Sequence, residues 1–325
     1  MQILLTGSTG FLGNNVLRHL LKDGHQVVAT NRHTSDPRPF DGLDIETLQI
    51  DLNDLKSVGH AVSDVDLVIH SAASIHLGWT QLEASRRVNV AATQGLAQAA
   101  RRRNIRMIHV STVDTLAPAS STTVMTETDQ HPSKPACSYV VSKREAEVAF
   151  LQEVQRGLDG VIVNPGFMVG PWDWKPSSGQ MMLAVAKGAG LFAPSGGCTV
   201  VDVRDVACGI ISAIENGRSG ERYILGGENL TYRELWTQMA RVVGRRPPLT
   251  TLPRWVNWTA GAFGDLYGKV SGKEPLINSA NTQMGSLYHW YSSDKAESEL
   301  GYKIGSVNDG LLDAWEWFRQ HGYAG

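Results

Sequence analysis

The sequence predicts an α/β protein. Its first part is expected to form a doubly wound parallel sheet, and its C-terminal part a smaller domain of mixed helices and strands. From residue 2 to residue 163, short apolar runs alternate with longer stretches in which apolar residues recur at helical spacing. Alternation of strands with helices is typical of a parallel sheet covered by helices on both faces. After Gly166 the alternation stops, and glycine, proline and tryptophan become frequent. We therefore expect two domains, residues 1–166 and mainly residues 167–325.

Each expected element has its own local signal. The strands are short apolar runs that end at glycine or polar residues, and they are expected at 2–5, 25–30, 45–50, 65–70, 106–110 and 160–163. The first helices are expected at 11–21, 82–103 and 139–155, with a shorter one that ends near Ala61. Later elements are strands at 200–203 and 222–225 and helices at 232–243 and 311–321. The segment at about 200–226 is expected to return to the first domain.

The bulk composition limits the classes of function. The chain has 325 residues, of which 42% are hydrophobic and 19% charged, and its formal net charge is −2. This balance suits a globular protein and gives no reason to expect nucleic acid or an anionic membrane surface as a partner. Because the sequence contains no run of about 18 apolar residues, no integral membrane segment is expected. The start does not resemble a signal peptide, and the three cysteines lack C-x-x-C spacing, so we expect a cytoplasmic protein with reduced thiols.

The first strand leads into a glycine-rich loop, TGSTGFLG at residues 6–13. Glycines at positions 7, 10 and 13 between a strand and a helix are the context of a dinucleotide site. Without Cβ atoms the backbone can approach a pyrophosphate closely, and the helix N-terminus offers free N–H groups with a partial positive charge. We expect this loop to bind a cofactor through Gly7, Thr9, Gly10, Phe11 and Leu12.

Two further strand ends bear on the choice of cofactor. The second strand ends at Thr30, and Arg32 follows in the region where an acidic residue would bind the adenosine ribose of NAD. An arginine at this place can pair with the 2′-phosphate of NADP. NADP(H) is therefore favoured, and NAD(H) stays an alternative. Asp51 and Leu52 end the third strand, where a carboxylate and an apolar side chain can hold the adenine ring.

A tyrosine and a lysine form the candidate acid–base pair. Tyr139 and Lys143 lie four residues apart at the start of a predicted helix, so both are on one face. A nearby ammonium stabilises phenolate and is expected to lower the pKa of Tyr139, which makes the phenol a usable proton donor or acceptor. The preceding strand ends in Ser111 and Thr112, where a hydroxyl can hydrogen-bond the reacting oxygen. Asn89 lies inside a predicted helix, although asparagine has a low helix propensity. Its side chain can bind local backbone groups or position a water molecule.

Together these motifs resemble those of the extended short-chain dehydrogenase/reductases, over essentially the whole chain. Further matches are Ser71-Ala72-Ala73, Pro165-Gly166, VDVRDVA at 201–207 and SSDKAESELGY at 292–302. The most similar branch contains dihydroflavonol reductases, 3β-hydroxysteroid dehydrogenases and hopanoid-associated sugar-epimerase-like proteins. The resemblance implies a catalytic set of Thr112, Tyr139 and Lys143, with Asn89 as a fourth, water-organising residue. It also implies cofactor contacts from Ser71, Ala72, Ala73, Tyr139, Lys143, Pro165 and Gly166.

The function predicted from these residues is hydride transfer between a nicotinamide and the carbonyl or alcohol group of a small molecule. Phe167 stands where nucleotide-sugar epimerases usually carry asparagine, which favours an apolar substrate. Aromatic residues that can line its pocket follow, at Trp172, Trp174, Phe192, Trp255, Trp258, Phe263, Tyr267, Tyr288 and Trp290. The first alternative is a nucleotide-sugar epimerase or dehydratase that keeps its NAD(P) bound. The second is a non-catalytic NADP-sensing protein, although a sensor has no need of the Tyr/Lys/hydroxyl set.

Three further expectations concern other sites. Histidines and carboxylates show no metal-ligand spacing, and no G-x-S-x-G is present, so neither a metal site nor a hydrolase is expected. The aromatic residues between 255 and 267 recur at rough helical spacing and belong to the core, to a substrate pocket or to a membrane-facing patch. Small residues on several faces of the helices at 82–103 and 139–155, together with the resemblance, predict a homodimer.

Overall fold

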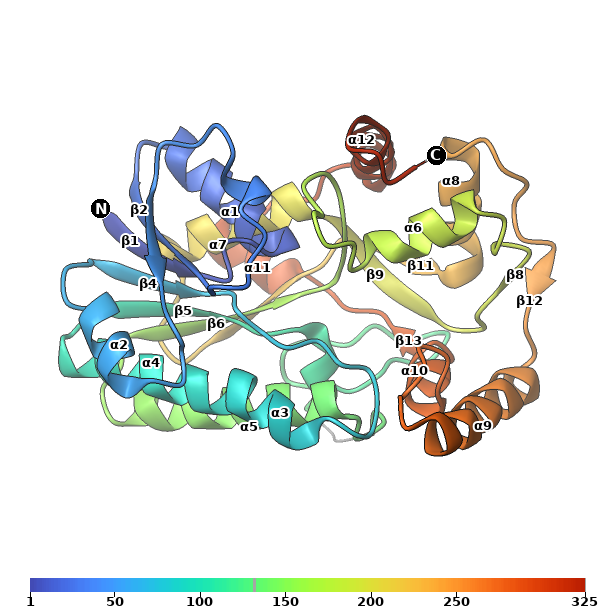
Figure 1. The fold of residues 1–325 in the computed structure, drawn as a ribbon, viewed down its shortest axis with the longest axis horizontal. Coiled ribbons are helices and arrows are strands. Elements are labelled where there is room, and N and C mark those ends of the chain that lie inside the picture. Colours follow the sequence, from blue (N-terminus) through green and yellow to red (C-terminus); the bar gives the residue numbers. More distant parts are fainter. Residues whose placement is uncertain (131–132, 325) are drawn as a thin grey trace.

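A computed structural model describes residues 1–130 and 133–324 (Figure 1). Its main sheet has seven strands in the order β10-β6-β5-β4-β1-β2-β3, and all neighbouring strands are parallel. The strands are β1 Gln2–Thr6, β2 Gln26–Asn31, β3 Glu46–Gln49, β4 Leu67–His70, β5 Arg106–Val110, β6 Gly160–Pro165 and β10 Arg222–Leu225. This confirms the predicted Rossmann-type doubly wound sheet. The strand order reverses between β1 and β4, and ligands in such folds bind at the carboxyl ends of the strands beside this reversal.

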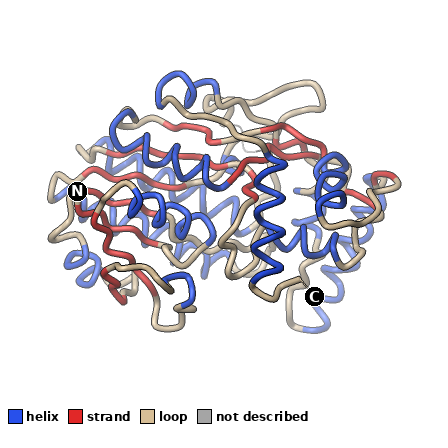
Figure 2. The backbone as a smooth tube through the Cα atoms, turned by 90° about the horizontal axis from the view of Figure 1, so that it is seen from above, coloured by secondary structure: helices blue, strands red, loops and turns tan. Residues whose placement is uncertain are grey.

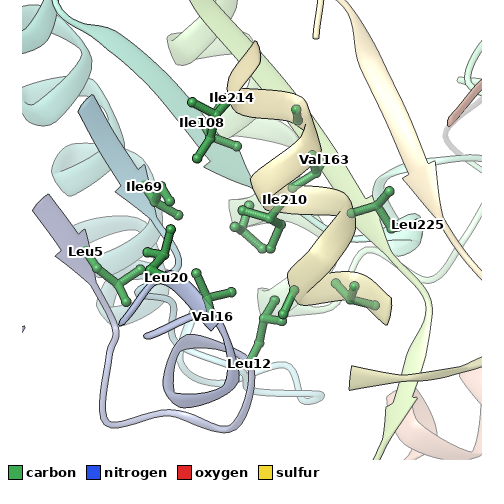
Figure 3. Close-up of a cluster of buried hydrophobic side chains, with 14 of the residues drawn as sticks. Leu5, Leu12, Val16, Leu20, Ile69, Ile108, Val163, Ile210, Ile214 and Leu225 are labelled. Atoms are coloured by element: carbon green, nitrogen blue, oxygen red, sulfur yellow. The ribbon is translucent and has the colours of Figure 1, made fainter. Parts of the chain in front are cut away.

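Helices cover both faces of the main sheet because its strands carry apolar side chains on both sides. In β1, Ile3 and Leu5 point to one face and Leu4 to the other, as the strand period of two requires. The first face is covered by α1 (Phe11–Lys22), α7 (Val203–Asn216) and α11 (Asp294–Leu300). The second is covered by α2 (Leu55–Ala61), α4 (Ala92–Arg102) and α5 (Ser138–Gln155). Figure 3 shows the first layer, where apolar residues of α1 and α7 meet the sheet, among them Leu12, Val16, Leu20, Ile210, Leu5, Ile69 and Ile108.

A smaller sheet lies beside the main one, on the side of the C-terminus (Figures 1 and 2). Its central strand, β9 (Gly197–Asp202), pairs with β7 (Phe167–Val169), β11 (Glu228–Thr231) and β13 (Tyr288–His289). The helices α6 (Gly179–Ala186), α8 (Tyr232–Val242) and α12 (Val307–Gln320) share a core with β9. The other elements are β8 Phe192–Ala193, which pairs with β12 Thr250–Thr251, the helices α9 Arg254–Ser271 and α10 Ser279–Met284, and the 3-10 turns Arg38–Phe40 and Val113–Thr115.

The chain passes between the two sheets three times: from β6 to β7, from β9 to β10 and from β10 to β11. After β9, α7 packs against α1, and β10 then joins the edge of the main sheet beside β6. The segment that contains α7 and β10 thus lies with the first sheet, whereas β9 itself belongs to the second. The division into residues 1–166 and 167–325 as two domains stays a prediction.

The helix expected at 82–103 forms over residues 82–102 but contains one wide turn. It consists of α3 (Leu82–Arg86), a π-helical turn (Arg87–Ala91) and α4. Hydrophobic spacing indicates a helix but does not reveal one wide turn within it. Asn89 lies in this turn, and π turns are frequent at functional sites.

Of the nine aromatic residues after Phe167 that were expected to line a pocket, six fall into two groups, whereas Phe192 is exposed and the half-buried Tyr288 and Trp290 pack together with ring centroids 4.7 Å apart. Trp172 and Trp174 pack with Trp317 and His321, and the guanidinium of Arg18 lies 3.4 Å from the Trp172 ring centroid. These two tryptophans are therefore part of the packing between α1 and α12, and not free walls of a pocket. The four aromatic residues of α9 are all exposed, which excludes the core among the three alternatives that their spacing left open.

Candidate active site

The loop between β1 and α1 is lined by backbone because its glycines leave no room for side chains. Gly7 has a φ of 74°, and a Cβ there would lie 2.6 Å from the backbone N of Ala72. A Cβ on Gly13 would lie 2.1 Å from the carbonyl oxygen of Gly7, so α1 packs directly on the loop. Among residues 1–130 and 133–324, no side chain caps α1, whose N-cap is Gly10. The N–H groups of the first turn can therefore bind an anion, and the loop fits the pyrophosphate of a dinucleotide.

Other predicted cofactor residues lie at the same edge of the sheet because each follows the carboxyl end of a parallel strand. Ser71, Ala72 and Ala73 follow β4, and Ala72 N donates a hydrogen bond to Oγ1 of Thr6 at 3.3 Å. Pro165 ends β6, and Gly166 lies so close to β9 that a Cβ on it would meet the Thr199 side chain at 2.7 Å. The edge thus offers a narrow strip of backbone and small side chains.

The residues predicted to hold the adenosine end lie at the ends of β2 and β3. The Arg32 side chain is exposed, and its backbone N donates to Oγ of Ser35 at 3.0 Å. Asp51 is exposed, and its Oδ1 accepts hydrogen bonds from N and Nδ2 of Asn53 at 2.9 and 3.0 Å. Leu52 is half-buried against the core.

The side chains of the glycine-rich loop have different surroundings. Thr9 and Phe11 are half-buried, and Phe11 packs on the core of the first layer. Leu12 is buried in that core, so only its backbone N–H can reach a phosphate.

A tyrosine and a threonine meet at the centre of this edge. Tyr139 is in the first turn of α5, and its phenol lies near the side chain of Thr112, which directly follows Ser111 at the end of β5, so that the Thr112 hydroxyl acts to lower the pKa of the phenol. Oγ1 of Thr112 also accepts a hydrogen bond from the backbone N–H of Asp114 at 3.2 Å. Burial raises the pKa of Tyr139 well above its usual range, the Asp114 carboxylate raises it further, and the Thr112 hydroxyl opposes both. The phenol is therefore held protonated.

Lys143 lies one helical turn after Tyr139 and is buried. Its Nζ donates a hydrogen bond to the carbonyl oxygen of Val110 at 2.8 Å. Burial lowers the pKa of Lys143 to about 8, and the Glu147 carboxylate opposes that shift. The expectation that Lys143 lowers the pKa of Tyr139 is wrong for the protein without bound cofactor. Burial and the Asp114 carboxylate determine the pKa of the phenol instead, and both raise it.

Asn89 fixes the loop that follows β4. Its Oδ1 accepts from the backbone N of Ser74 at 2.7 Å, and its Nδ2 donates to Ser74 O at 3.0 Å and to Ser142 Oγ at 2.9 Å. The same loop meets the start of α5, where the backbone N of Tyr139 donates to His76 O at 3.2 Å. Asn89 thus connects the π turn, the loop and α5, whereas its water-organising role stays a prediction.

A buried carboxylate, which the sequence analysis missed, organises the end of β5. Oε1 of Glu147 accepts hydrogen bonds from Ser111 Oγ at 2.5 Å, from Thr115 Oγ1 at 2.9 Å and from Asn164 Nδ2 at 2.9 Å. Its Oε2 lies 3.0 Å from Nε of Arg222 on β10. The Ser111 hydroxyl is therefore bound to Glu147, whereas the Thr112 hydroxyl is the one that acts on the pKa of Tyr139. The spacing of Glu147 one turn beyond Lys143 was a visible signal.

A second missed group surrounds Asp114. Its Oδ1 lies 3.0 Å from the wholly buried Nζ of Lys134 and 3.2 Å from Nδ1 of His289 on β13. Burial alone would raise the pKa of Asp114, but Lys134 and His289 outweigh it, so the pKa lies well below its usual range. The three residues come from segments far apart in the sequence, and no spacing could have joined them. Asp114, held in this way, is also the carboxylate that raises the pKa of Tyr139.

Two searches of residues 1–130 and 133–324 bear on other classes of site. They contain no group of three or more histidine, cysteine or carboxylate side chains that could hold a metal ion. No helix in the same part of the chain is long and apolar enough to cross a membrane.

Comparison with known protein families gives the same assignment as the geometry of this edge, with its glycine-rich loop and its Tyr139–Lys143 turn. Residues 3–226 match the NAD dependent epimerase/dehydratase family. The chain belongs to this family. Within it, the chain is an oxidoreductase of the extended short-chain dehydrogenase/reductase type, as its relatives also indicate.

Relatives match along nearly the whole length. The chain is 32% identical to "Sterol demethylase protein B" of Methylococcus capsulatus, over 99% of both chains. It is 28% identical to the "4-hydroxy-2-methyl-3-oxo-4-farnesyl-3,4-dihydroquinoline-1-oxide ketoreductase" of Stigmatella aurantiaca, over 100% of this chain and 98% of that one. The crystal structure of gox2253 is 33% identical and superimposes with a TM-score of 0.88, covering 100% of this chain and 99% of the other.

Proposed function

We propose that this oxidoreductase reduces a ketone or aldehyde on a largely apolar small molecule with NADPH. The observation that carries the proposal is the placement of Tyr139, whose phenol lies near the Thr112 hydroxyl and one helical turn before the buried Lys143. These three groups lie at the strand ends, next to a loop that fits a dinucleotide. A non-catalytic binding protein would need the loop but not a half-buried phenol that is held in its protonated form.

The chain's own residues have separate tasks in this reaction. A bound nicotinamide would exchange hydride with the carbonyl carbon. Because Oγ1 of Thr112 accepts from the backbone of Asp114, its own proton is directed to the substrate oxygen or to Tyr139. Tyr139 donates its phenolic proton to that oxygen, and the reverse reaction returns it. Lys143 would hold the ribose of the cofactor and stabilise the phenolate that remains.

An apolar substrate is supported by the relatives and by Phe167. One relative is named for a sterol and another for a farnesyl quinoline oxide. Phe167 is half-buried at the start of β7, on the smaller sheet. An apolar ring there can contact hydrocarbon but offers no hydrogen bond to a sugar. A nucleotide-sugar epimerase is the second candidate, because the family is described by epimerases and dehydratases.

NADP(H) is the proposed cofactor, and Arg32 is the reason. Its side chain is exposed just beyond β2, and a guanidinium can bind the 2′-phosphate. One charged hydrogen bond contributes roughly 1.5–3 kcal/mol, or about ten- to a hundredfold in affinity. Titration of both cofactors should show tighter binding of NADPH, and Arg32→Ala should remove the difference. Equal affinities of the wild type for NADPH and NADH would refute the preference.

We also propose a homodimer in the cytoplasm. Val148 on α5 is exposed and can belong to an interface between copies, whereas Ala92 and Leu96 on α4 and Val140 on α5 are buried within the chain. The three cysteines are unpaired, which suits a reducing compartment. Light scattering at micromolar concentration measures the assembly, and a monomeric mass would contradict the dimer.

Tyr139→Phe tests the chemistry directly. Loss of the phenolic proton should lower kcat by on the order of 10²–10⁴-fold, with NADPH affinity nearly unchanged because the ring still packs. Tyr267→Phe, on the exposed face of α9, is the matched control and should keep full activity. NADPH oxidation is followed with sterol ketones, aryl ketones and long-chain 3-oxo compounds. A Tyr139→Phe variant with more than a few per cent of wild-type kcat would show that another group is the acid.

The same screen separates the two alternatives. UDP- and dTDP-sugars are offered with catalytic amounts of NADP(H). Epimerisation without net consumption of cofactor would favour the epimerase. Cofactor binding with no turnover of any substrate would favour the NADP-sensing protein.

A further inference from the structure

The helix α9 turns its small and polar residues toward the protein. Asn257 and Gly261 are its buried residues. A Cβ on Gly261 would lie 2.3 Å from Oγ1 of Thr282, and one on Gly264 would clash with the carbonyl oxygen of Ile277. The glycines thus let the backbone of α9 lie directly on α10 and the segment before it. This leaves the large side chains of α9 to point outward.

The outer face of α9 is an exposed apolar surface. Its six large apolar side chains are between 58% and 83% exposed: Trp255, Trp258, Phe263, Leu266, Tyr267 and Val270. Leu276 and Ile277, just beyond the helix, are 77% and 62% exposed. Soluble proteins rarely leave so large a contiguous apolar surface uncovered, and such a surface marks an interaction site. Figure 1 shows α9 at the outer corner of the molecule, below the smaller sheet.

The charges around this face are positive. Residues 245–281 contain five basic residues and two carboxylates. Both carboxylates are bound within the protein: Asp265 accepts from the backbone N of Ser279 at 3.0 Å, and Glu274 lies 2.8 Å from Nε2 of His76 with 8% of its side chain exposed. Arg254, Lys269 and Lys273 are exposed at the two ends of the helix. The overall charge of −2 concealed this local excess.

An apolar face that contains tryptophan and tyrosine and is flanked by basic residues has the chemistry of the membrane–water interface. A second copy of the chain fits it less well. In a two-fold contact between antiparallel α9 helices, Arg254 of one copy would approach Lys269 of the other, and like charges would repel. We propose that the outer face of α9 docks the protein on the surface of an anionic lipid bilayer, without crossing it.

The docked helix is connected to the active-site edge. Glu274 accepts hydrogen bonds from the backbone N of Trp79 at 2.7 Å and from Oγ1 of Thr80 at 2.6 Å. Asn278 Nδ2 donates to the carbonyl oxygen of Leu77 at 3.0 Å. This loop also holds the start of α5, where the backbone N of Ser138 donates to Gly78 O at 2.8 Å. Docking therefore brings the edge that carries Tyr139 close to the lipid.

Vesicle sedimentation with the full chain tests the proposal. Vesicles of phosphatidylcholine alone are compared with vesicles that also contain phosphatidylglycerol. The wild type should bind the anionic vesicles. The double variant Trp255→Ser/Phe263→Ser should lose on the order of tenfold or more of that binding. Lys269→Gln and Lys273→Gln should each cost about fivefold. Leu55→Ser, which replaces a 65% exposed leucine on α2, is the matched control and should bind as the wild type does.

Several results would overturn the inference. The wild type could stay in the supernatant with both vesicles, or Leu55→Ser could lose as much binding as the α9 variant. A dimer that Trp255→Ser/Phe263→Ser dissociates, with no vesicle binding, would make a second copy the occupant. NADPH affinity confirms that each variant is folded. Because the assay measures no catalysis, its failure leaves the proposed reductase activity untouched, and loss of that activity leaves the docking result unchanged.

Discussion

Two glycine-to-alanine substitutions within helices should have opposite effects on the stability of the protein. Gly13 and Gly59 both lie within helices, α1 and α2. Alanine is a better helix former than glycine by roughly 0.5–1 kcal/mol. A Cβ on Gly59 meets nothing within 4 Å, so Gly59→Ala should raise the free energy of unfolding by about that amount.

Gly13→Ala meets backbone instead. Its Cβ would lie 2.1 Å from Gly7 O, whereas real Cβ contacts essentially never fall below 3.0 Å, so the loop or the helix must move by at least about 0.9 Å. Overpacking of this kind costs typically 1–3 kcal/mol. Because Gly7 O is a backbone atom of the cofactor loop, it cannot move away alone. We expect a net loss of about 1–2 kcal/mol after the gain in helix propensity. NADPH affinity should fall at least about tenfold because the loop N–H groups are displaced.

Thermal unfolding and NADPH fluorescence titration measure both effects. In a protein of 325 residues 1 kcal/mol corresponds to roughly 1.5 °C in Tm, so Gly59→Ala should raise Tm by about 1 °C and Gly13→Ala should lower it by about 1.5–3 °C. If Gly13→Ala were as stable as Gly59→Ala and bound NADPH like the wild type, the close packing of α1 on the loop would be refuted.

The remaining predictions concern buried charges. Glu147→Gln should lower the free energy of unfolding by about 3–5 kcal/mol, because it breaks a buried ion pair and a set of hydrogen bonds; Glu145→Gln, on the partly exposed side of the same helix, should cost under about 1 kcal/mol in urea unfolding. In the reductive direction kcat should fall as pH rises through about 8, since burial sets the pKa of Lys143 there and its ammonium is lost above it; a flat profile from pH 7 to 9 would exclude that role. Asp114→Asn should destabilise the fold by about 3–5 kcal/mol because it leaves the buried Lys134 ammonium unpaired, and Lys134→Met in the same chain should recover part of the loss in thermal unfolding.

The sequence alone determined the fold class, the family and the positions of the main strands along the chain. These follow from local signals: apolar runs with strand or helix period, and glycines at the turn from β1 to α1. The TGSTGFLG loop is read directly because its residues are consecutive. Tyr139 and Lys143 were recognisable for the same reason, since one helical turn separates them.

Tertiary structure decided what surrounds these residues. Lys134, Asp114 and His289 meet from three distant segments, and Glu147 reaches Arg222 on β10. The direction of the Tyr139 pKa depends on burial and on Asp114, neither of which has a fixed spacing from the tyrosine.

The helix α9 shows most clearly which feature a sequence pattern does not predict. Its aromatic residues recur with a helical period whether they face a core, a pocket or solvent. Only the glycine contacts with α10 show which side points inward. The hydrophobic period is set by residues that are near one another in the sequence. Which side of a helix is covered depends on distant segments that come together only when the chain folds.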